Sequence, residues 1–254
     1  MTYSGSEVAQ LLAHDLRWKL VERLGRSDFR VGELVEWVGE RQNLVSYHLA
    51  LLRSAGLLTE RRSSADGRDI YYSLDLARLE TSIGGMASSL NPALRVVTGA
   101  KEDEERSAKS IPLARVLFLC TANSARSQMA EALLRDLSRG TIEVQSAGSR
   151  PISIHPVALA VLAELGVPAD GLRSKSFSEF RDERFDLIIS LCDKVREECS
   201  VFPGDPERIH WSLADPAAVD GAPEVVHAAF VTTANELTTR LRYLILTLDR
   251  PRRS

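Results

Sequence analysis

The sequence predicts two domains of different fold class, a mainly α domain that ends in a β-hairpin and an α/β domain with a parallel sheet. The chain has 254 residues, a length that accommodates one large domain or two modest ones. Apolar residues recur at helical spacing up to residue 55, whereas strand and helix patterns alternate after residue 114. A charge run without an apolar stripe, residues 101–109, separates the two patterns and is typical of a solvated linker. The predicted parts are 1–80, the first domain; 81–113, a helical segment and charged linker; and 114–254, the second domain.

The first domain is predicted to contain helices at 6–25, 31–38 and 44–52, and strands at 57–62 and 69–74. Each helix carries an apolar stripe, and the first pattern fits either one helix or a pair. The two strands flank a polar turn, Ser63–Arg68. Helix, short helix, turn, helix and hairpin is the element order of a winged helix-turn-helix. Residues 76–98 are weakly helical, with interruptions expected at Gly84-Gly85 and Asn91-Pro92.

The second domain is predicted to have strands at 115–120, 142–146 and 185–191, and helices through 129–137, at 156–165 and at 224–248. Alternating strands and helices imply a parallel sheet that is covered on both faces. With 44% hydrophobic and 26% charged residues, the composition excludes disordered, collagen-like and disulfide-scaffold classes. No apolar run reaches the roughly 18 residues of a membrane span, and the start lacks a signal-peptide pattern, so we expect a cytoplasmic protein without membrane contact.

The chain has three cysteines, at positions 120, 192 and 199. A reducing cytoplasm rarely supports structural disulfides, so these thiols are expected to have a chemical role.

Cys120 ends a predicted buried strand, and Arg126 stands six positions later at the start of a helix. A loop in this position aims its backbone N–H groups at one point, where the helix dipole favours an anion. The same field is expected to lower the pKa of the Cys120 thiol, and Arg126 can donate two hydrogen bonds to a tetrahedral oxyanion. The pattern predicts attack by sulfur on phosphate or a similar anion; the alternative is a strand-end cysteine with an unrelated surface arginine. The predicted oxyanion-binding residues are Thr121, Ala122, Asn123, Ser124, Ala125 and Arg126.

The string Leu119-Cys-Thr-Ala-Asn-Ser-Ala-Arg-Ser-Gln-Met-Ala-Glu131 resembles the opening motif of arsenate reductases that share the low-molecular-weight tyrosine phosphatase fold. The resemblance covers residues 114–248. It implies that Cys120 is the nucleophile, that Arg126 binds the oxyanion, that Ser127 hydrogen-bonds the thiolate and that Asn123 supports the loop.

The resemblance extends to Asp215-Pro216, which matches an Asp-Pro whose carboxylate protonates the leaving oxygen. As a bare dipeptide, Asp-Pro is also a common turn start. Tyrosine phosphatases of this fold usually place an aromatic residue next, whereas Ala217 and Ala218 follow here, which favours a small inorganic oxyanion. Some relatives carry an additional cysteine where this chain has Ala125, so only three thiols are expected to take part.

Cys192 and Cys199 resemble the relay pair of the thioredoxin-coupled reductases. The resemblance implies that Cys192 attacks the Cys120–arsenic adduct and releases arsenite, and that Cys199 then resolves the disulfide. Electrons would come from thioredoxin or another thiol donor, with no tightly bound cofactor and no metal. If Asp193–Glu198 is helical, it must unwind on oxidation, because seven residues rise about 10.5 Å along a helix and a disulfide tolerates only about 7 Å between Cα atoms. The alternative is two unrelated cysteines.

Residues 11–24 and 42–57 resemble the ArsR family of dimeric winged-helix repressors, over about residues 5–80. The resemblance implies a homodimer through this domain and a double-stranded DNA operator, with the helix from Gln42 to Ser54 in the major groove. The residues expected to meet DNA are Gln42, Asn43, Ser46, Tyr47 and His48 on the helix, and Arg61, Arg62 and Arg68 on the wing. Residues 41–75 hold five arginines and four acidic residues, a net charge of only +1, so a domain used only for protein contacts is the alternative.

The predicted function is therefore an arsenate reductase fused to an ArsR-like transcriptional regulator. Two alternatives stay open: a DNA-binding regulator whose second domain senses phosphate or arsenate without turnover, and a low-molecular-weight tyrosine phosphatase. The first domain has no cysteine and only two histidines, His14 and His48, so an arsenic signal would have to enter through the three thiols.

Overall fold

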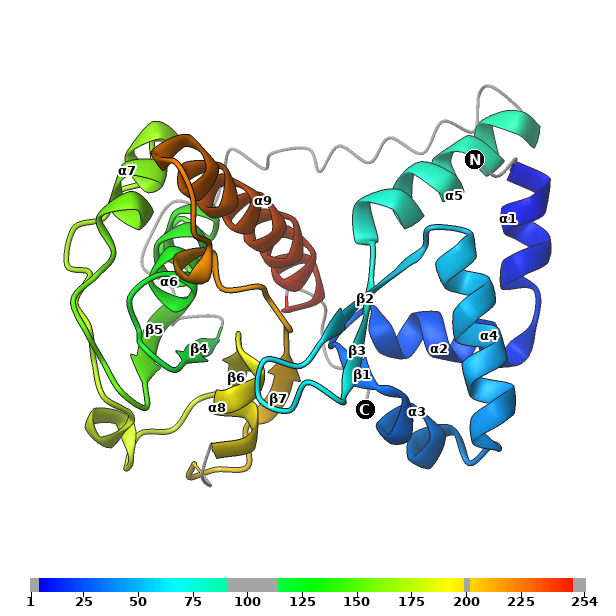
Figure 1. Ribbon diagram of the computed structural model, residues 1–254, viewed down its shortest axis with the longest axis horizontal. Coiled ribbons are helices and arrows are strands. Elements are labelled where there is room, and N and C mark those ends of the chain that lie inside the picture. The colour runs from blue at the N-terminus through cyan, green and yellow to red at the C-terminus, as the bar shows by residue number, and fades with distance from the viewer. Residues whose placement is uncertain (1–4, 91–113, 199–201, 249–254) are drawn as a thin grey trace. The chain divides into compact units, whose positions relative to one another are not determined.

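The structure is a computed structural model in which the chain forms two compact units, residues 1–63 with 67–109 and residues 110–254 with 64–66 (Figure 1). We call them the amino-terminal and the carboxy-terminal unit. The structure describes residues 5–90, 114–198 and 202–248. Within these ranges no helix is both long enough and apolar enough to cross a membrane.

The amino-terminal unit contains five helices and a three-stranded sheet among the described residues. They are α1 (Gly5–Leu12), α2 (Asp15–Leu24), α3 (Val31–Val38), α4 (Gln42–Ser54) and α5 (Leu76–Leu90), with β1 (Phe29–Arg30), β2 (Leu58–Arg62) and β3 (Ile70–Leu74). The pattern over 6–25 is thus a pair of helices, because the His14 imidazole accepts a hydrogen bond from the Leu16 N–H and starts a new helix. The predicted hairpin is confirmed, since β2 and β3 pair antiparallel from Leu58↔Leu74 to Arg62↔Ile70.

The interruption expected at Gly84-Gly85 is wrong, because α5 continues through both glycines to Leu90. A Cβ added to either glycine would meet nothing within 4 Å, so no packing demand selects glycine there. Each glycine costs a helix only about 1 kcal/mol relative to alanine. The expected break at Asn91-Pro92 and the charge run 101–109 lie outside the described residues.

The carboxy-terminal unit alternates strands and helices, as predicted. Its elements are β4 (Arg115–Cys120), α6 (Arg126–Leu137), β5 (Glu143–Gly148), α7 (Pro156–Glu164), η2 (Phe177–Phe180), β6 (Leu187–Ser190), α8 (Asp193–Glu198), β7 (Glu207–His210), η3 (Pro216–Ala218) and α9 (Pro223–Leu248). The four strands pair parallel in the order β5-β4-β6-β7, which confirms the predicted parallel sheet. The sequence pattern missed β7, because its four residues include two charged ones and only half of the strand is buried.

Strand β4 is the centre of this sheet and positions the site. Residues 116–119 are completely buried, as expected of a strand covered on both faces. The chain leaves β4 first for β5 and later returns on the other side as β6, so the carboxyl end of β4 lies at a point where strand order reverses. The Leu191 N–H donates to the Leu119 carbonyl over 2.8 Å, which continues the pairing of β4 with β6. Cys120 and Cys192 therefore leave the sheet at neighbouring positions.

Gly148, the last residue of β5, lies against the loop that follows β4. A Cβ added to it would stand 2.6 Å from the Thr121 carbonyl oxygen and 2.9 Å from the Asn123 nitrogen. Both atoms belong to the backbone, so a side chain at this position cannot be accommodated by a rotamer change.

We expect Gly148→Ala to displace the loop after β4 and to destabilise the carboxy-terminal unit by about 1–3 kcal/mol, the usual cost of overpacking. Hydrogen-exchange mass spectrometry of the peptides that contain β4 and β5 measures this change within one unit. Gly84→Ala is the control, since its added methyl group meets nothing. Equal protection of β4 and β5 in Gly148→Ala and in the parent would contradict the expectation.

Candidate active site

The loop between β4 and α6 turns its carbonyl groups outward. The carbonyl oxygens of Thr121, Ala122 and Ser124 accept hydrogen bonds from the N–H groups of residues 150, 152 and 155, over 2.8, 3.0 and 2.9 Å. Because a trans peptide points its C=O and N–H in opposite directions, the N–H groups that belong to these peptides face the inside of the loop. Asn123 assists this turn with a left-handed backbone, φ 44°. The arrangement has the geometry of a backbone nest, in which inward N–H groups suit an anion.

Cys120 lies at the base of this loop, with 2% of its surface exposed. Its Sγ is 2.9 Å from the Ser127 Oγ and accepts a hydrogen bond from the Asn123 N–H over 3.1 Å. The structure therefore brings three of the predicted residues together around one sulfur atom.

The Asn123 side chain is completely buried and uses both ends of its amide. Its Nδ2 donates to Ser127 Oγ over 2.9 Å and to Ser146 Oγ over 2.8 Å. Its Oδ1 accepts from the Lys175 N–H over 2.6 Å and from Gln128 Nε2 over 3.0 Å. These four bonds join α6, β5 and the segment before η2, and they fix the loop at the residue that turns it.

A buried ion pair lies behind Asn123 that sequence reasoning missed. Lys175 Nζ is 3.0 Å from Glu131 Oε2, and both side chains are almost completely buried. The Ser146 Oγ donates to the same carboxylate over 2.6 Å. Glu131 is the last residue of the motif string. It is a charged residue in a helical turn whose other residues are buried, and this was the sequence signal that could have revealed the ion pair. No sequence feature pointed to Lys175.

Arg126 and Asp215 meet at this loop. Arg126 Nη2 is 2.7 Å from Asp215 Oδ2, and its Nη1 donates to the Leu213 carbonyl over 3.0 Å. The Arg126 side chain is buried, whereas the Asp215 side chain is 42% exposed. Asp215 also accepts a hydrogen bond from the Ala217 N–H over 3.2 Å and thereby starts η3. The Asp-Pro pair therefore begins a turn and also places its carboxylate against Arg126.

Cys192 lies beside the same loop, with its Sγ 3.3 Å from the Thr121 Oγ1. It is buried like Cys120, and both are free thiols. The residues that follow it, Asp193–Glu198, form helix α8. Because this segment is helical, α8 would have to unwind before Cys192 and Cys199 could form a disulfide. Cys199 lies outside the described residues.

Burial raises the pKa of the Cys120 thiol above its usual value. The positive charge of Arg126 and the hydrogen bond with Ser127 act in the opposite direction and lower it, but burial is the larger effect. The sequence-based expectation of a lowered pKa is therefore wrong for this geometry, because the strand end that aims the sulfur into the loop also removes it from water.

The residues predicted to contact DNA lie on α4, on β2 and in the turn after β2. Gln42, Asn43, Tyr47, Arg62 and Arg68 are exposed, and Ser46 and Arg61 are partly exposed.

His48 is a correction to the predicted DNA contacts, because its side chain is buried, with 3% exposed. Its ring packs 4.3 Å from the His14 ring, and its Nδ1 is 3.4 Å from Arg17 Nη1. Burial lowers the pKa of His48, which favours the neutral imidazole, and the ring belongs to the helix packing.

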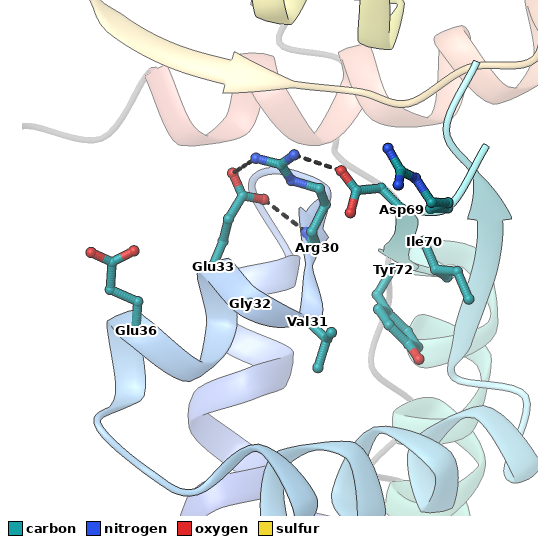
Figure 2. A pocket seen from close by; sticks show the side chains of 9 residues that line it. Arg30, Val31, Gly32, Glu33, Glu36, Asp69, Ile70 and Tyr72 are labelled. Carbon is teal, nitrogen blue, oxygen red and sulfur yellow. Dashed lines mark hydrogen bonds and ion pairs between the residues drawn. The ribbon is translucent and has the colours of Figure 1, made fainter. Parts of the chain in front are cut away.

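A hollow of about 510 Å³ lies in the amino-terminal unit, between the start of α3 and β3 (Figure 2). Arg30 extends into it and pairs with Asp69 over 2.7 Å and with Glu33 over 3.5 Å. The Asp69 carboxylate raises the pKa of Arg30 above its usual value. Because Arg30 is neutralised by acidic residues of the same hollow, it does not provide an anion site.

Comparisons with known proteins give a family match and several similar proteins. The family model for low molecular weight phosphotyrosine protein phosphatase matches residues 115–254. An arsenate reductase of Halalkalibacterium halodurans is 32% identical over 127 residues, which are 50% of this chain and 91% of that protein. A glutaredoxin arsenate reductase of Synechocystis is 40% identical over 78 residues, 31% of this chain and 60% of that protein. A solved structure of an arsenate reductase in the phosphate binding state has 31% identity and a TM-score of 0.43, and the match covers 53% of this chain and 98% of that one.

We expect the rate at which iodoacetamide alkylates Cys120 to rise with pH, with a midpoint above the ordinary thiol value of about 8.5. Arg126→Ala removes a charge that lowers the pKa of Cys120, so its midpoint should move further upward. Peptide mass spectrometry measures Cys120 separately from the other two cysteines, and Arg181→Ala, an exposed arginine, is the control. A midpoint at or below the ordinary value in the parent protein would contradict this expectation.

Proposed function

The chain belongs to the low molecular weight phosphotyrosine protein phosphatase family through residues 115–254, and on that premise we propose that its carboxy-terminal unit reduces arsenate to arsenite. Family membership and the named relatives make the chain an enzyme with phosphatase-like chemistry. The single observation that favours reduction over ester hydrolysis is the second buried thiol, Cys192, beside the loop that holds Cys120. A phosphatase completes its turnover with water and needs no such group.

In the first proposed step, arsenate occupies the loop 121–126, where inward N–H groups and Arg126 bind its oxygens. The Cys120 thiolate attacks arsenic and forms an S–As bond. One As–O bond breaks, and the departing oxygen leaves as water after it takes a proton from Asp215. The support for these roles is the contact of Cys120 with Ser127 and that of Arg126 with Asp215.

In the second proposed step, the Cys192 thiolate attacks Cys120 Sγ. An S–S bond forms, and the electron pair of the S–As bond stays on arsenic, which changes from As(V) to As(III) and leaves as arsenite. Two thiols are thereby oxidised. Cys199 then attacks Cys192 and releases Cys120 as a thiolate, which requires α8 to unwind.

An external thiol donor of the thioredoxin or glutaredoxin class would reduce the Cys192–Cys199 disulfide. Support comes from the Synechocystis relative, whose name includes glutaredoxin. We place this chemistry in the cytoplasm, where such donors keep thiols reduced.

We propose further that the amino-terminal unit is an ArsR-like winged helix-turn-helix that binds an operator as a homodimer. Supporting observations are the order of α3, α4 and the β2–β3 hairpin, the exposed residues at the start of α4, and the arginines on the hairpin. In this arrangement α4 enters the major groove and Arg61, Arg62 and Arg68 meet phosphates.

We expect the parent protein to consume NADPH when arsenate, thioredoxin and thioredoxin reductase are supplied. Cys120→Ser, Cys192→Ser and Cys199→Ser should each abolish this turnover, because each thiol carries one step of the electron transfer. Hydrolysis of p-nitrophenyl phosphate should vanish in Cys120→Ser and survive in the other two variants.

Three outcomes of this assay are decisive. Hydrolysis without arsenate reduction in the parent would contradict the reductase and favour a phosphatase. Oxyanion binding without either activity would favour a regulator that senses the anion. Reduction that persists in Cys192→Ser would contradict the relay.

We expect Tyr47→Ala, on the exposed face of α4, to weaken operator binding by about 1–3 kcal/mol, the usual value of a base-edge contact. Arg62→Ala and Arg68→Ala should each reduce the salt dependence of binding by about two released counterions, one for each protomer of the dimer. The measurement is a salt titration of binding to an operator selected from random DNA, with Arg181→Ala as the control. Selection that enriches no sequence would contradict a DNA-binding role.

A further inference from the structure

Four polar side chains form a buried network next to Cys192 that the proposed chemistry does not use. They are Ser190, Asp193, His210 and Ser212, all with less than a tenth of their surface exposed. Asp193 is completely buried, and such a carboxylate persists in a protein only when hydrogen-bond donors surround it.

The distances in this network are those of hydrogen bonds. Asp193 Oδ1 is 3.1 Å from His210 Nε2 and accepts the Ser212 hydroxyl over 2.8 Å. Its other oxygen, Oδ2, accepts the N–H and the hydroxyl of Ser64, over 2.7 and 3.0 Å, so His210 is one of several groups that hold this carboxylate. On the other side of the ring, His210 Nδ1 is 2.9 Å from Ser190 Oγ. The imidazole thus bridges a hydroxyl and a carboxylate.

Three members of the network stand at the end of an element. Ser190 ends β6, His210 ends β7 and Asp193 begins α8, three elements that lie together at one side of the sheet (Figure 1). Cys192 lies between two anchored residues, Leu191, whose N–H is bonded to β4, and Asp193, whose carboxylate is bonded to His210. The network therefore fixes the start of α8 relative to the sheet.

The order Ser190–His210–Asp193 is also that of a hydrolase triad, but the geometry does not suit hydrolysis. Ser190 is the last residue of a strand that pairs on both sides, and its side chain is buried, so its hydroxyl is not presented to a substrate. The network has a positioning role instead.

We propose that His210 is a positioning residue which, through Asp193, holds Cys192 beside the loop while the rest of α8 unwinds. This inference rests on the proposed reductase function. Cys192 must react first with Cys120 and then with Cys199, and the second reaction cannot occur across an intact α8. If unwinding began at Cys192 itself, the thiol would leave Thr121 and the first reaction would be lost. The hydrogen-bonded Asp193 carboxylate holds the first residue of α8 in place, and the helix unwinds only beyond this residue.

The decisive variant is His210→Phe, which keeps an aromatic ring and removes both nitrogen atoms. We expect kcat for arsenate reduction to fall about 10- to 100-fold, because the attacking sulfur is misplaced. KM for arsenate should stay within about twofold, because arsenate binds in the loop 121–126 and not at Cys192. Hydrolysis of p-nitrophenyl phosphate should be equally unaffected, since it does not need Cys192.

Two further variants separate positioning from general stability. His210→Gln, whose amide nitrogen can still donate to Asp193, should restore most of kcat. His227→Phe is the matched control, because it removes another histidine–carboxylate pair, the 2.9 Å contact with Glu164 between α9 and α7. It should leave both activities unchanged. Ser212→Ala removes only one donor from Asp193 and should give a smaller effect in the same direction.

Alkylation provides a readout that does not depend on arsenate. In His210→Phe, iodoacetamide should modify Cys192 about tenfold faster than in the parent, because the start of α8 opens more often, while Cys120 should react as before. Absence of arsenate reduction in the parent would reject the proposed function, and the alkylation rates would still decide the inference. Unchanged alkylation of Cys192, or an equal loss of ester hydrolysis and arsenate reduction, would overturn it.

Discussion

The amide of Asn123 is the interaction on which the site depends. A loop that turns its carbonyls outward and its N–H groups inward is unfavourable unless every outward group finds a partner, because a buried polar group without one costs about 1–3 kcal/mol. The Asn123 side chain makes four hydrogen bonds, and Asn123 is the loop residue that has a left-handed backbone. The Lys175–Glu131 pair and Ser146 hold the amide in turn, so the geometry of the nest is set by buried contacts within the protein and needs no bound anion.

The same burial creates the main electrostatic conflict of the site. A sulfur aimed into the nest is withdrawn from water, which favours the neutral thiol, while Arg126 and Ser127 favour the thiolate. Arg126 is itself shared, because its guanidinium contacts Asp215 and the Leu213 carbonyl. A bound oxyanion would compete with Asp215 for Arg126, so oxyanion binding and the position of the Asp215 side chain are coupled through one arginine.

Much of this structure could be predicted from local sequence patterns. The features that could not be predicted depend on tertiary contacts. The longer helices and the strands β2–β6 were predictable because their apolar residues repeat at the periods of a helix or a buried strand, whereas the mostly charged α8 has no such repeat. Cys120 and Arg126 were predictable because the loop places its chemistry within a few residues of sequence, and Asn123 and Ser127 because the string resembles a known motif. Lys175 and His210 were not, since each acts through a partner that lies far away in the chain. The burial of His48 and the direction of the Cys120 pKa depend on neighbours that no spacing reveals.

A thiol relay imposes opposite demands on its second cysteine, which must be held close to the first and yet become free to meet the third. A rigid helix satisfies only the first demand, and a flexible loop satisfies only the second. Helix α8 is short and mostly charged, so its few internal hydrogen bonds can be exchanged for bonds to water, and the one core side chain that its opening displaces is Val195. Its first residue carries a buried carboxylate that cannot be exposed or left unpaired without a large penalty. The boundary between the part that stays and the part that opens therefore falls after Asp193, which directly follows Cys192 and keeps this thiol in place.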